Sequence, residues 1–452
     1  MYPTHRLSEK LKVILTLLFP ILVTQIGLSA MSFFDTLMSG HAGTNDLAGV
    51  AIGSSLWMPV YTGLSGILIA ITTLISNHLG RKRQRAIPFT LMQGIYLSIA
   101  IALAVVIIGG VVLQPILNAM ELTEVVQSIA KRYLHALAIG ILPLFVYGVL
   151  RNFMDAHGKT TITMVITLCS LPINILFNYL FIFGKFGFPR LGGVGTGYAT
   201  AITYWIIALI ALIVIIRVHP FASYKPFRHV YKISFKEWKA QLKIGVPIGF
   251  AIFFETSIFS AVTLFMSRYG TVTVAAHQAA LNFEALLFMV PLSIAMALTI
   301  AVGYENGSGR YQDAKTYSFL GIGLAIIIAC VLSIFLYTFR ESFARLYTED
   351  SHVLQLTSHF LIYAVFFQLS DALQAPIQGA LRGYKDVNVA LILTLIAYWI
   401  IGLPLGYILA AYTGLGPYGY WVGLICGLAL GAIGLALRLI TLQKQEMHQS
   451  IH

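Results

Sequence analysis

Long apolar runs, separated by short polar segments, recur along the whole chain. An α-helix needs roughly 20 consecutive apolar residues to cross a bilayer, and each of these runs is long enough. The pattern predicts twelve membrane-spanning helices, at residues 11–40, 46–77, 86–115, 125–154, 159–183, 192–217, 238–268, 273–304, 314–339, 352–381, 387–411 and 417–441. We therefore expect an all-α polytopic membrane protein.

The composition agrees with this pattern. The chain has 452 residues, of which 58% are hydrophobic and only 10% are charged. A soluble protein of this composition would expose far too much apolar surface, whereas a multi-pass membrane protein would not. The three cysteines, Cys169, Cys330 and Cys426, fall in apolar runs and lack the spacing of metal ligands, so we interpret them as small core residues.

Lys and Arg concentrate in alternate loops, such as "GRKRQRA" at residues 80–86. Because cytoplasmic loops of membrane proteins carry the excess of Lys and Arg, this asymmetry places both termini and residues 218–237 in the cytoplasm. The net charge of +12 is explained in the same way and does not indicate binding to nucleic acid.

The chain divides into two related halves. The cytoplasmic linker 218–237 separates an N-terminal lobe, 1–217, from a C-terminal lobe, 238–452, and each lobe contains six predicted spans. The segments "SFFDT" and "IFFET" align Asp35 with Glu255, and "LRNFMDAHGK" resembles "LRGYKDVN". We expect two pseudo-symmetric six-helix bundles, an arrangement that usually places the substrate site where the repeats meet.

Four of the seventeen acids lie well inside predicted spans: Asp35, Glu255, Glu284 and Asp371. No span interior contains a Lys or Arg to neutralise them. A carboxylate in hydrocarbon without a basic partner costs several kcal/mol unless it takes up a proton or binds a cation. These four residues are our candidates for cation coupling. The alternative is a protonated carboxyl that is hydrogen-bonded for structural reasons only.

Asp35 has polar neighbours at a similar predicted depth. It precedes the outer end of its span by about 7–8 Å of helix. Asn174 and Asn178 lie four residues apart on one face of the fifth span, and Thr196 lies near the outer end of the sixth. Amide, hydroxyl and carboxylate oxygens suit a proton or a hard monovalent cation. The alternative is that the two asparagines only hold helices together.

Aromatic and Met side chains adapt to varied ligands and attract cations through the faces of their rings. Candidates for the wall of a substrate cavity are Phe34, Met38, Trp57, Phe253, Phe259, Met289 and Phe367. Packing inside a lobe, or contact with lipid, is the alternative for each of them.

The segments "FFDTLMSG", "LPINILFNYLFIFG" and "SDALQAPIQGALRGYKD", in this order, resemble the MATE family of multidrug and toxic compound extruders, most closely its bacterial NorM branch. The resemblance implies a monomeric antiporter of the bacterial plasma (inner) membrane. Such a protein expels amphipathic, often cationic drugs in exchange for Na⁺ or H⁺, confers antibiotic resistance and has no cofactor.

The same resemblance implies roles for individual residues. Glu255 and Asp371 match the Na⁺ ligands of the second half, and Asp35, Asn174, Asn178 and Thr196 match the first-half site. Some relatives have an aspartate where this chain has Asn178, or a tyrosine where it has Phe367. The absence of that aspartate favours Na⁺, with H⁺ as the alternative.

Two other functions are less consistent with the sequence. A flippase for lipid-linked oligosaccharides has a related architecture, but it needs basic residues in its cavity, and here Lys and Arg lie at span ends. A membrane enzyme would need a phosphate-binding loop, a metal cluster or a His–acid pair, and the spans show none of these. We interpret His78, His135 and His277 as interfacial residues.

Overall fold

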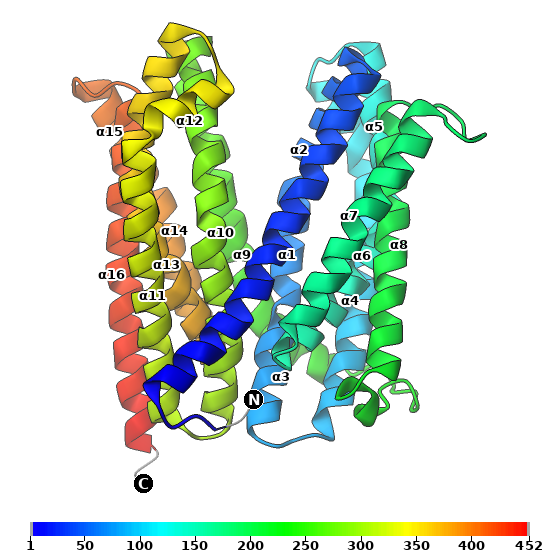
Figure 1. The fold of residues 1–452 in the computed structure, drawn as a ribbon, viewed down its shortest axis with the longest axis vertical. Helices are drawn as coiled ribbons and strands as arrows, with labels where there is room; N and C mark the ends of the chain where they lie inside the picture. Colours follow the sequence, from blue (N-terminus) through cyan, green and yellow to red (C-terminus); the bar gives the residue numbers. More distant parts are fainter. Residues whose placement is uncertain (1–2, 450–452) are drawn as a thin grey trace. The chain divides into compact units, whose positions relative to one another are not determined.

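The computed structural model describes residues 3–449, which form helices and connecting loops without a β-strand (Figure 1). Among these described residues, eleven helices are long and apolar enough to cross a membrane. The number is twelve if α5 (Glu124–Ala138) and α6 (Ile141–Ala156), which meet at a 49° bend, form one further span. The prediction of an all-α, multi-pass membrane protein is confirmed.

Contacts within the chain define two compact units, which are described separately below. The N-terminal unit is Pro20–Gly249, and the C-terminal unit combines Met1–Phe19 with Phe250–His452. Both boundaries fall inside long helices, α1 (Leu7–Ala42) and α9 (Phe235–Met266). The lobe boundaries drawn from the sequence, at 217 and 238, remain a prediction about the repeated halves.

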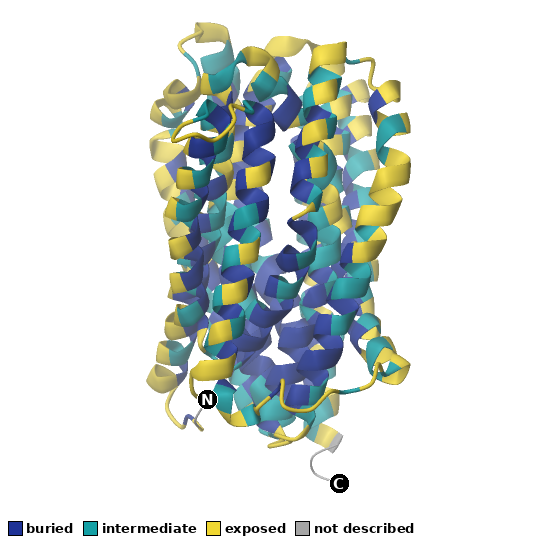
Figure 2. Ribbon diagram, turned by 90° about the vertical axis from the view of Figure 1, so that its right-hand side faces the viewer, coloured by how far each residue is buried: buried dark blue, intermediate teal, exposed yellow. Residues whose placement is uncertain are grey.

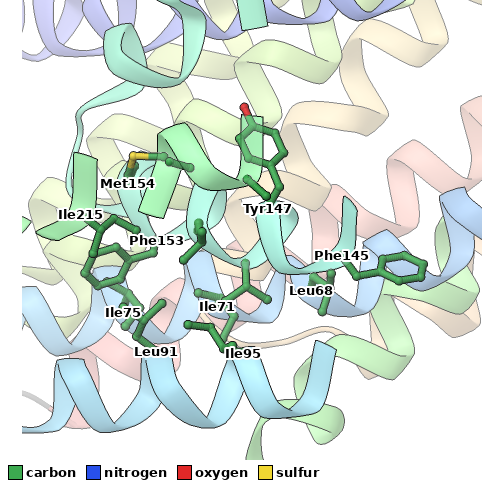
Figure 3. Close-up of a cluster of buried hydrophobic side chains, with 14 of the residues drawn as sticks. Leu68, Ile71, Ile75, Leu91, Ile95, Phe145, Tyr147, Phe153, Met154 and Ile215 are labelled. Atoms are coloured by element: carbon green, nitrogen blue, oxygen red, sulfur yellow. The ribbon is translucent and has the colours of Figure 1, made fainter. Parts of the chain in front are cut away.

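The N-terminal unit is built around α2 to α8. The remaining bounds are α2 (Thr44–Leu68), α3 (Ala70–Gly80), α4 (Ala86–Ala119), α7 (Thr160–Phe183) and α8 (Gly193–Arg217). Apolar side chains from α2, α3, α4, α6 and α8 meet in one cluster, which includes Leu68, Ile71, Leu91, Phe153 and Ile215 (Figure 3). Their interdigitation fixes how these helices pack.

The segment after α8 is anchored on this unit. Phe221, in the short helix η1 (Phe221–Tyr224), is fully buried, and the Tyr224 hydroxyl lies 3.1 Å from His157 Nε2. Gln93 Nε2 donates to the Lys232 carbonyl at 2.7 Å, and Gln93 Oε1 accepts from the Ser234 amide at 2.9 Å. Residues 218–234 are therefore part of the packed N-terminal unit.

The C-terminal unit contains α10 to α16. The bounds are η2 (Ser267–Tyr269), α10 (Thr271–Gly307), α11 (Tyr311–Thr338), α12 (Arg340–Tyr347), α13 (Ser351–Gly383), α14 (Asn388–Leu395), η3 (Ile396–Gly402), α15 (Leu403–Tyr412) and α16 (Tyr418–Gln449). Helices α10 and α13 approach each other closely at Gly379 on α13. A Cβ atom at this position would overlap the backbone of Ala295 on α10, so only glycine allows this distance. The Thr299 hydroxyl also donates to the Gly379 carbonyl at 3.0 Å.

The start of α1 belongs to the C-terminal unit through polar contacts. Lys10 Nζ lies 2.8 Å from Asp313 Oδ1, and the Thr4 hydroxyl lies 3.0 Å from that of Tyr317. Lys10 is buried, so this ion pair is shielded from water more than a surface pair would be. The contact ties the first turns of α1 to α11.

Many helices expose one apolar face. On α8, Trp205, Leu209, Ile213 and Ile216 are exposed at helical spacing, and yellow stripes of this kind run along helices in Figure 2. The expectation that the three cysteines are core residues is wrong, since all three are exposed. In a protein surrounded by hydrocarbon, an apolar residue does not need to face the core.

One of the three histidines predicted near the membrane edges is buried within the protein. His277 lies near the start of α10, with Thr263 Oγ1 and Trp421 Nε1 each 3.0 Å from its ring nitrogens. These two hydrogen bonds compensate the cost of removing the imidazole from water. His135 is exposed and His78 is half-buried.

Candidate cation sites

The first site lies within the N-terminal unit, where α1, α7 and α8 meet. Asn178 Nδ2 donates to Asp35 Oδ1 at 2.7 Å, and Thr200 Oγ1 donates to Asp35 Oδ2 at 3.3 Å. Asn178 Nδ2 also lies 3.0 Å from Asn174 Oδ1. The structure therefore brings Asp35, Asn174 and Asn178 together, as the sequence predicted.

Both asparagines are completely buried, while Asp35 is half-buried. The amide oxygen Oδ1 of Asn178 accepts no hydrogen bond from the described residues. A buried oxygen without a donor costs free energy unless a cation or a water molecule satisfies it. The first site therefore contains carboxylate, hydroxyl and amide oxygens, with the nitrogen of Asn178 facing Asp35.

The structure places Thr200, not Thr196, beside Asp35. The Thr196 hydroxyl lies 2.8 Å from that of Ser39, one helical turn from the carboxylate on both helices. Thr200 follows Thr196 by four residues, so both lie on the same face of α8. That spacing could have identified Thr200 in the sequence.

The second site lies within the C-terminal unit and is centred on α13. Gln378 Nε2 donates to Glu255 Oε1 at 2.6 Å and to Thr394 Oγ1 at 2.9 Å. Trp399 Nε1 donates to the Phe254 carbonyl at 3.1 Å, which fixes η3 beside α9. Gln378 thus connects α9, α13 and α14 at the acid.

Two further acids adjoin Glu255. The side chains of Glu284 on α10 and Asp371 on α13 are buried and neighbour each other, and Asp371 also lies within electrostatic range of Glu255. The structure therefore brings together the three second-half acids that the sequence selected.

Buried polar side chains follow one face of α13. Asp371, Gln374, Gln378 and Arg382 are spaced three or four residues apart and have exposed fractions of 7%, 2%, 5% and 7%. The sequence placed Arg382 at the end of its span, and the structure agrees, because Arg382 lies in the last turn of α13. Its side chain is nevertheless buried there, within electrostatic range of Glu255.

Tyr398 was not identified from the sequence. It is buried in η3, a segment of π-helix, and its side chain lies within electrostatic range of Glu255, Glu284 and Asp371. Short π-helical segments occur frequently at functional sites. Its aromatic, apolar surroundings in the sequence gave no signal of this position.

The predicted cavity residues occupy different environments. Phe367 is completely buried between Phe259 and Trp421, with ring centroids 5.6 and 6.0 Å away, so it packs in the core and does not face an open cavity here. Trp57 packs against Phe145, and Phe253 is exposed. The half-buried members of the set are Phe34, Met38, Trp57, Phe259 and Met289, and their role toward a substrate remains a prediction.

In the part of the chain that the structure describes, no group of three or more His, Cys, Asp or Glu side chains could hold a metal ion. A sodium ion at either site would therefore need amide, hydroxyl or carbonyl oxygens beside the carboxylates. Asn178 and Thr200 carry such oxygens in the first site, and Gln378 and Thr394 carry them in the second, although in the hydrogen bonds of this structure Asn178, Thr200 and Gln378 are donors. The role of Glu255 and Asp371 as Na⁺ ligands remains a prediction.

The membrane-spanning helices and the acids buried among them define a class: a multi-pass helical membrane protein with the features of a transporter. The chain belongs to the MatE family, whose model matches residues 20–180 and 247–408. The two matched segments lie in the two halves of the chain, as expected for the internal repeat.

Curated relatives cover the whole chain. A probable multidrug resistance protein NorM of Halalkalibacterium halodurans is 58% identical over 445 residues, 98% of this chain and 97% of that protein. A protein of the same name from Bacillus subtilis is 55% identical, with 98% of each chain covered. The protein is accordingly a membrane transporter and not an enzyme.

Solved structures share the fold at low sequence identity. The outward-facing conformation of a multidrug resistance MATE family transporter superposes with a TM-score of 0.87 at 19% identity, covering 98% of this chain and 100% of that one. A eukaryotic MATE transporter gives a TM-score of 0.85, also at 19% identity, with 98% and 99% covered.

Proposed function

We propose that the protein is a secondary active antiporter that exports amphipathic, often cationic compounds in exchange for inward Na⁺ or H⁺, by alternating access. The observation that supports this most directly is the first site. There Asp35 is held by neutral side chains, Asn178 and Thr200, and a buried amide oxygen of Asn178 accepts no hydrogen bond from residues 3–449. The names of the curated relatives support multidrug substrates.

The coupling in this proposal comes from competition between like charges. A cation that binds a buried carboxylate lowers the affinity of the same acidic surroundings for a cationic drug. The size of the coupling equals the difference in cation affinity between the drug-loaded and the drug-free protein, and linkage requires it to be reciprocal. A cation arriving from outside would therefore promote release of the drug.

The two sites favour different cations. The first offers one carboxylate with amide and hydroxyl oxygens, a ligand set that suits Na⁺. The second contains three neighbouring acids, Glu255, Glu284 and Asp371, and like charges this close to one another favour the uptake of a proton. We propose Na⁺ as the coupling ion, with H⁺ as the alternative that the experiment below separates.

The proposal also covers location. The protein resides in a bacterial plasma (inner) membrane as a monomer, with both termini and residues 218–237 in the cytoplasm. The support is the excess of Lys and Arg in alternate loops, which marks the cytoplasmic side.

Efflux of ethidium from proteoliposomes that contain the purified protein tests the function. One set of vesicles has an inward Na⁺ gradient at equal pH, and a second set has an inward proton gradient without Na⁺. Efflux driven by Na⁺ alone supports sodium antiport, and efflux driven only by the pH gradient supports proton antiport. The absence of efflux under both gradients contradicts drug–cation antiport for this substrate.

A further inference from the structure

An arginine that occurs in both repeats has different surroundings in the two halves of the chain. The related segments "LRNFMD" and "LRGYKD" align Arg151 with Arg382 and Asp155 with Asp386. In the N-terminal unit, Arg151 Nε lies 3.6 Å from Asp155 Oδ2 within α6. In the C-terminal unit, Asp386 Oδ2 instead lies 2.5 Å from Arg438 Nε on α16.

Asp386 is paired with Arg438, so Arg382 does not have the partner that its repeat equivalent Arg151 has. Arg382 is 7% exposed near the end of α13, one turn beyond Gln378, and its guanidinium lies within electrostatic range of Glu255 on α9 without forming an ion pair with it. A buried guanidinium is costly unless an acid compensates it. Glu255 is the repeat equivalent of Asp35, whose hydrogen-bond donors are the neutral Asn178 and Thr200.

Gln378 is close to both Arg382 and Glu255. It precedes Arg382 by one helical turn on the same face of α13, and its amide donates to Glu255 at 2.6 Å. From Asp371 to Arg382 this face rises about 16 Å along the helix. The charged and titratable groups around Glu255 are Arg382 and Asp371 on α13, Glu284 on α10 and Tyr398 on η3.

We propose that Arg382 is a counter-cation built into the second site, and that it sets the affinity of this site for the coupling cation. This inference rests on the proposed antiport. A permanent positive charge beside Glu255 reduces the attraction that an incoming cation experiences, so the cation binds more weakly and is released more readily. The first site lacks an equivalent charge, because Arg151 is paired with Asp155. The two sites consequently differ in affinity although they derive from one repeat.

The test measures the concentration of the coupling cation that gives half-maximal ethidium efflux. Ethidium is kept well below its own half-saturation, and choline chloride keeps the ionic strength constant. Arg382→Gln should lower the half-saturating Na⁺ concentration on the order of tenfold, as expected when one charge is removed near a buried carboxylate. If protons drive efflux, the half-maximal rate should occur about one pH unit higher. Arg382→Lys keeps the charge and should stay close to wild type.

Two controls separate this role from a merely structural one. Arg151→Gln alters the repeat-equivalent arginine, and it should leave the half-saturating concentration unchanged. In a Glu255→Gln background, Arg382→Gln should cause no further shift, because the charge acts through Glu255. An unchanged half-saturating concentration in a folded Arg382→Gln protein, or an equal shift in the Glu255→Gln background, would overturn the inference.

Thermal unfolding in detergent is a second test, which can be used if a variant accumulates too poorly for efflux measurements. If the charge of Glu255 is compensated by that of Arg382, the double variant Glu255→Gln/Arg382→Gln should unfold at a higher temperature than Arg382→Gln, because no uncompensated charge remains. A double variant that is no more stable than Arg382→Gln would contradict this compensation. Wild-type efflux that responds to neither cation would overturn the antiport proposal, and the unfolding comparison would still test the compensation.

Discussion

Asn178 donates a hydrogen bond of 2.7 Å to Asp35, although 143 positions separate the two residues along the chain. The same amide nitrogen lies 3.0 Å from Asn174, so the asparagine that orients the carboxylate is itself oriented from the preceding turn of α7. Such supporting contacts hold a ligand group in place before a cation arrives. This arrangement leads to the first two predictions.

Asp35→Asn should insert and fold normally but lose transport. The amide preserves the size of the side chain and removes the charge that a cation would neutralise, so we expect at least a tenfold fall in the rate of ethidium efflux. Glu341→Gln, which neutralises an exposed acid on α12, serves as the control and should transport normally. Normal efflux by Asp35→Asn would exclude the first site from coupling.

Thr200→Val and Thr196→Val form a matched pair on one face of α8. Thr200 donates to the Asp35 carboxylate, whereas Thr196 is hydrogen-bonded to Ser39. A hydrogen bond to a charged group contributes about 1.5–3 kcal/mol, so Thr200→Val should change the half-saturating cation concentration about tenfold. Thr196→Val should change it much less. Efflux measured over a range of cation concentrations distinguishes the two, and a larger effect at Thr196 would contradict the geometry of the site.

Gly379→Val should destabilise the C-terminal unit. The added side chain overlaps the Ala295 backbone where α10 and α13 pack most closely, and overpacking of this kind typically costs about 1–3 kcal/mol. Gly323 on α11 provides the control, because a Cβ atom there meets nothing within 4 Å. Gly323→Ala should therefore be neutral or slightly stabilising. The midpoint of thermal unfolding in detergent measures both effects, and an unchanged midpoint for Gly379→Val would contradict the close approach.

His157 should make the N-terminal unit sensitive to acid. Burial lowers the pKa of His157 from 6.5 to about 4, in a cluster with Phe153, Phe221 and Tyr224. Between these two values the unfolded chain binds a proton that the folded protein does not, so stability falls as the pH decreases from about 6.5 to about 4. The loss at the lower end amounts to up to about 3 kcal/mol.

Unfolding midpoints measured at intervals between pH 7 and pH 4 test this effect. His157→Gln should show a smaller decrease in midpoint than the wild type over that range, even if the variant is less stable at pH 7. His135→Gln, at an exposed position, should keep the wild-type slope. Identical slopes for wild type and His157→Gln would show that this histidine does not contribute to acid sensitivity.

The fold class could be predicted from the sequence because it depends on local hydrophobicity. A run long enough to cross a bilayer must become a helix, since every backbone polar group has to be satisfied within the segment. The pairing of Asp35 with Asn174 and Asn178 was also predictable, because their depth follows from counting residues along straight helices. The bend between α5 and α6 was not predicted, since residues 125–154 were expected to form one span.

The sequence by itself determined that this chain is an all-helical membrane protein with two related halves, each with acids inside its spans. Only the tertiary structure decided that Thr200 contacts Asp35, that Phe367 packs in the core, and that Arg382 interacts with Glu255. These relationships depend on helix rotation and on competition among partners, such as Arg438 binding Asp386. The pattern of apolar and polar residues does not specify which of two possible ion pairs forms. Packing and electrostatics between segments that are distant in the sequence decide this.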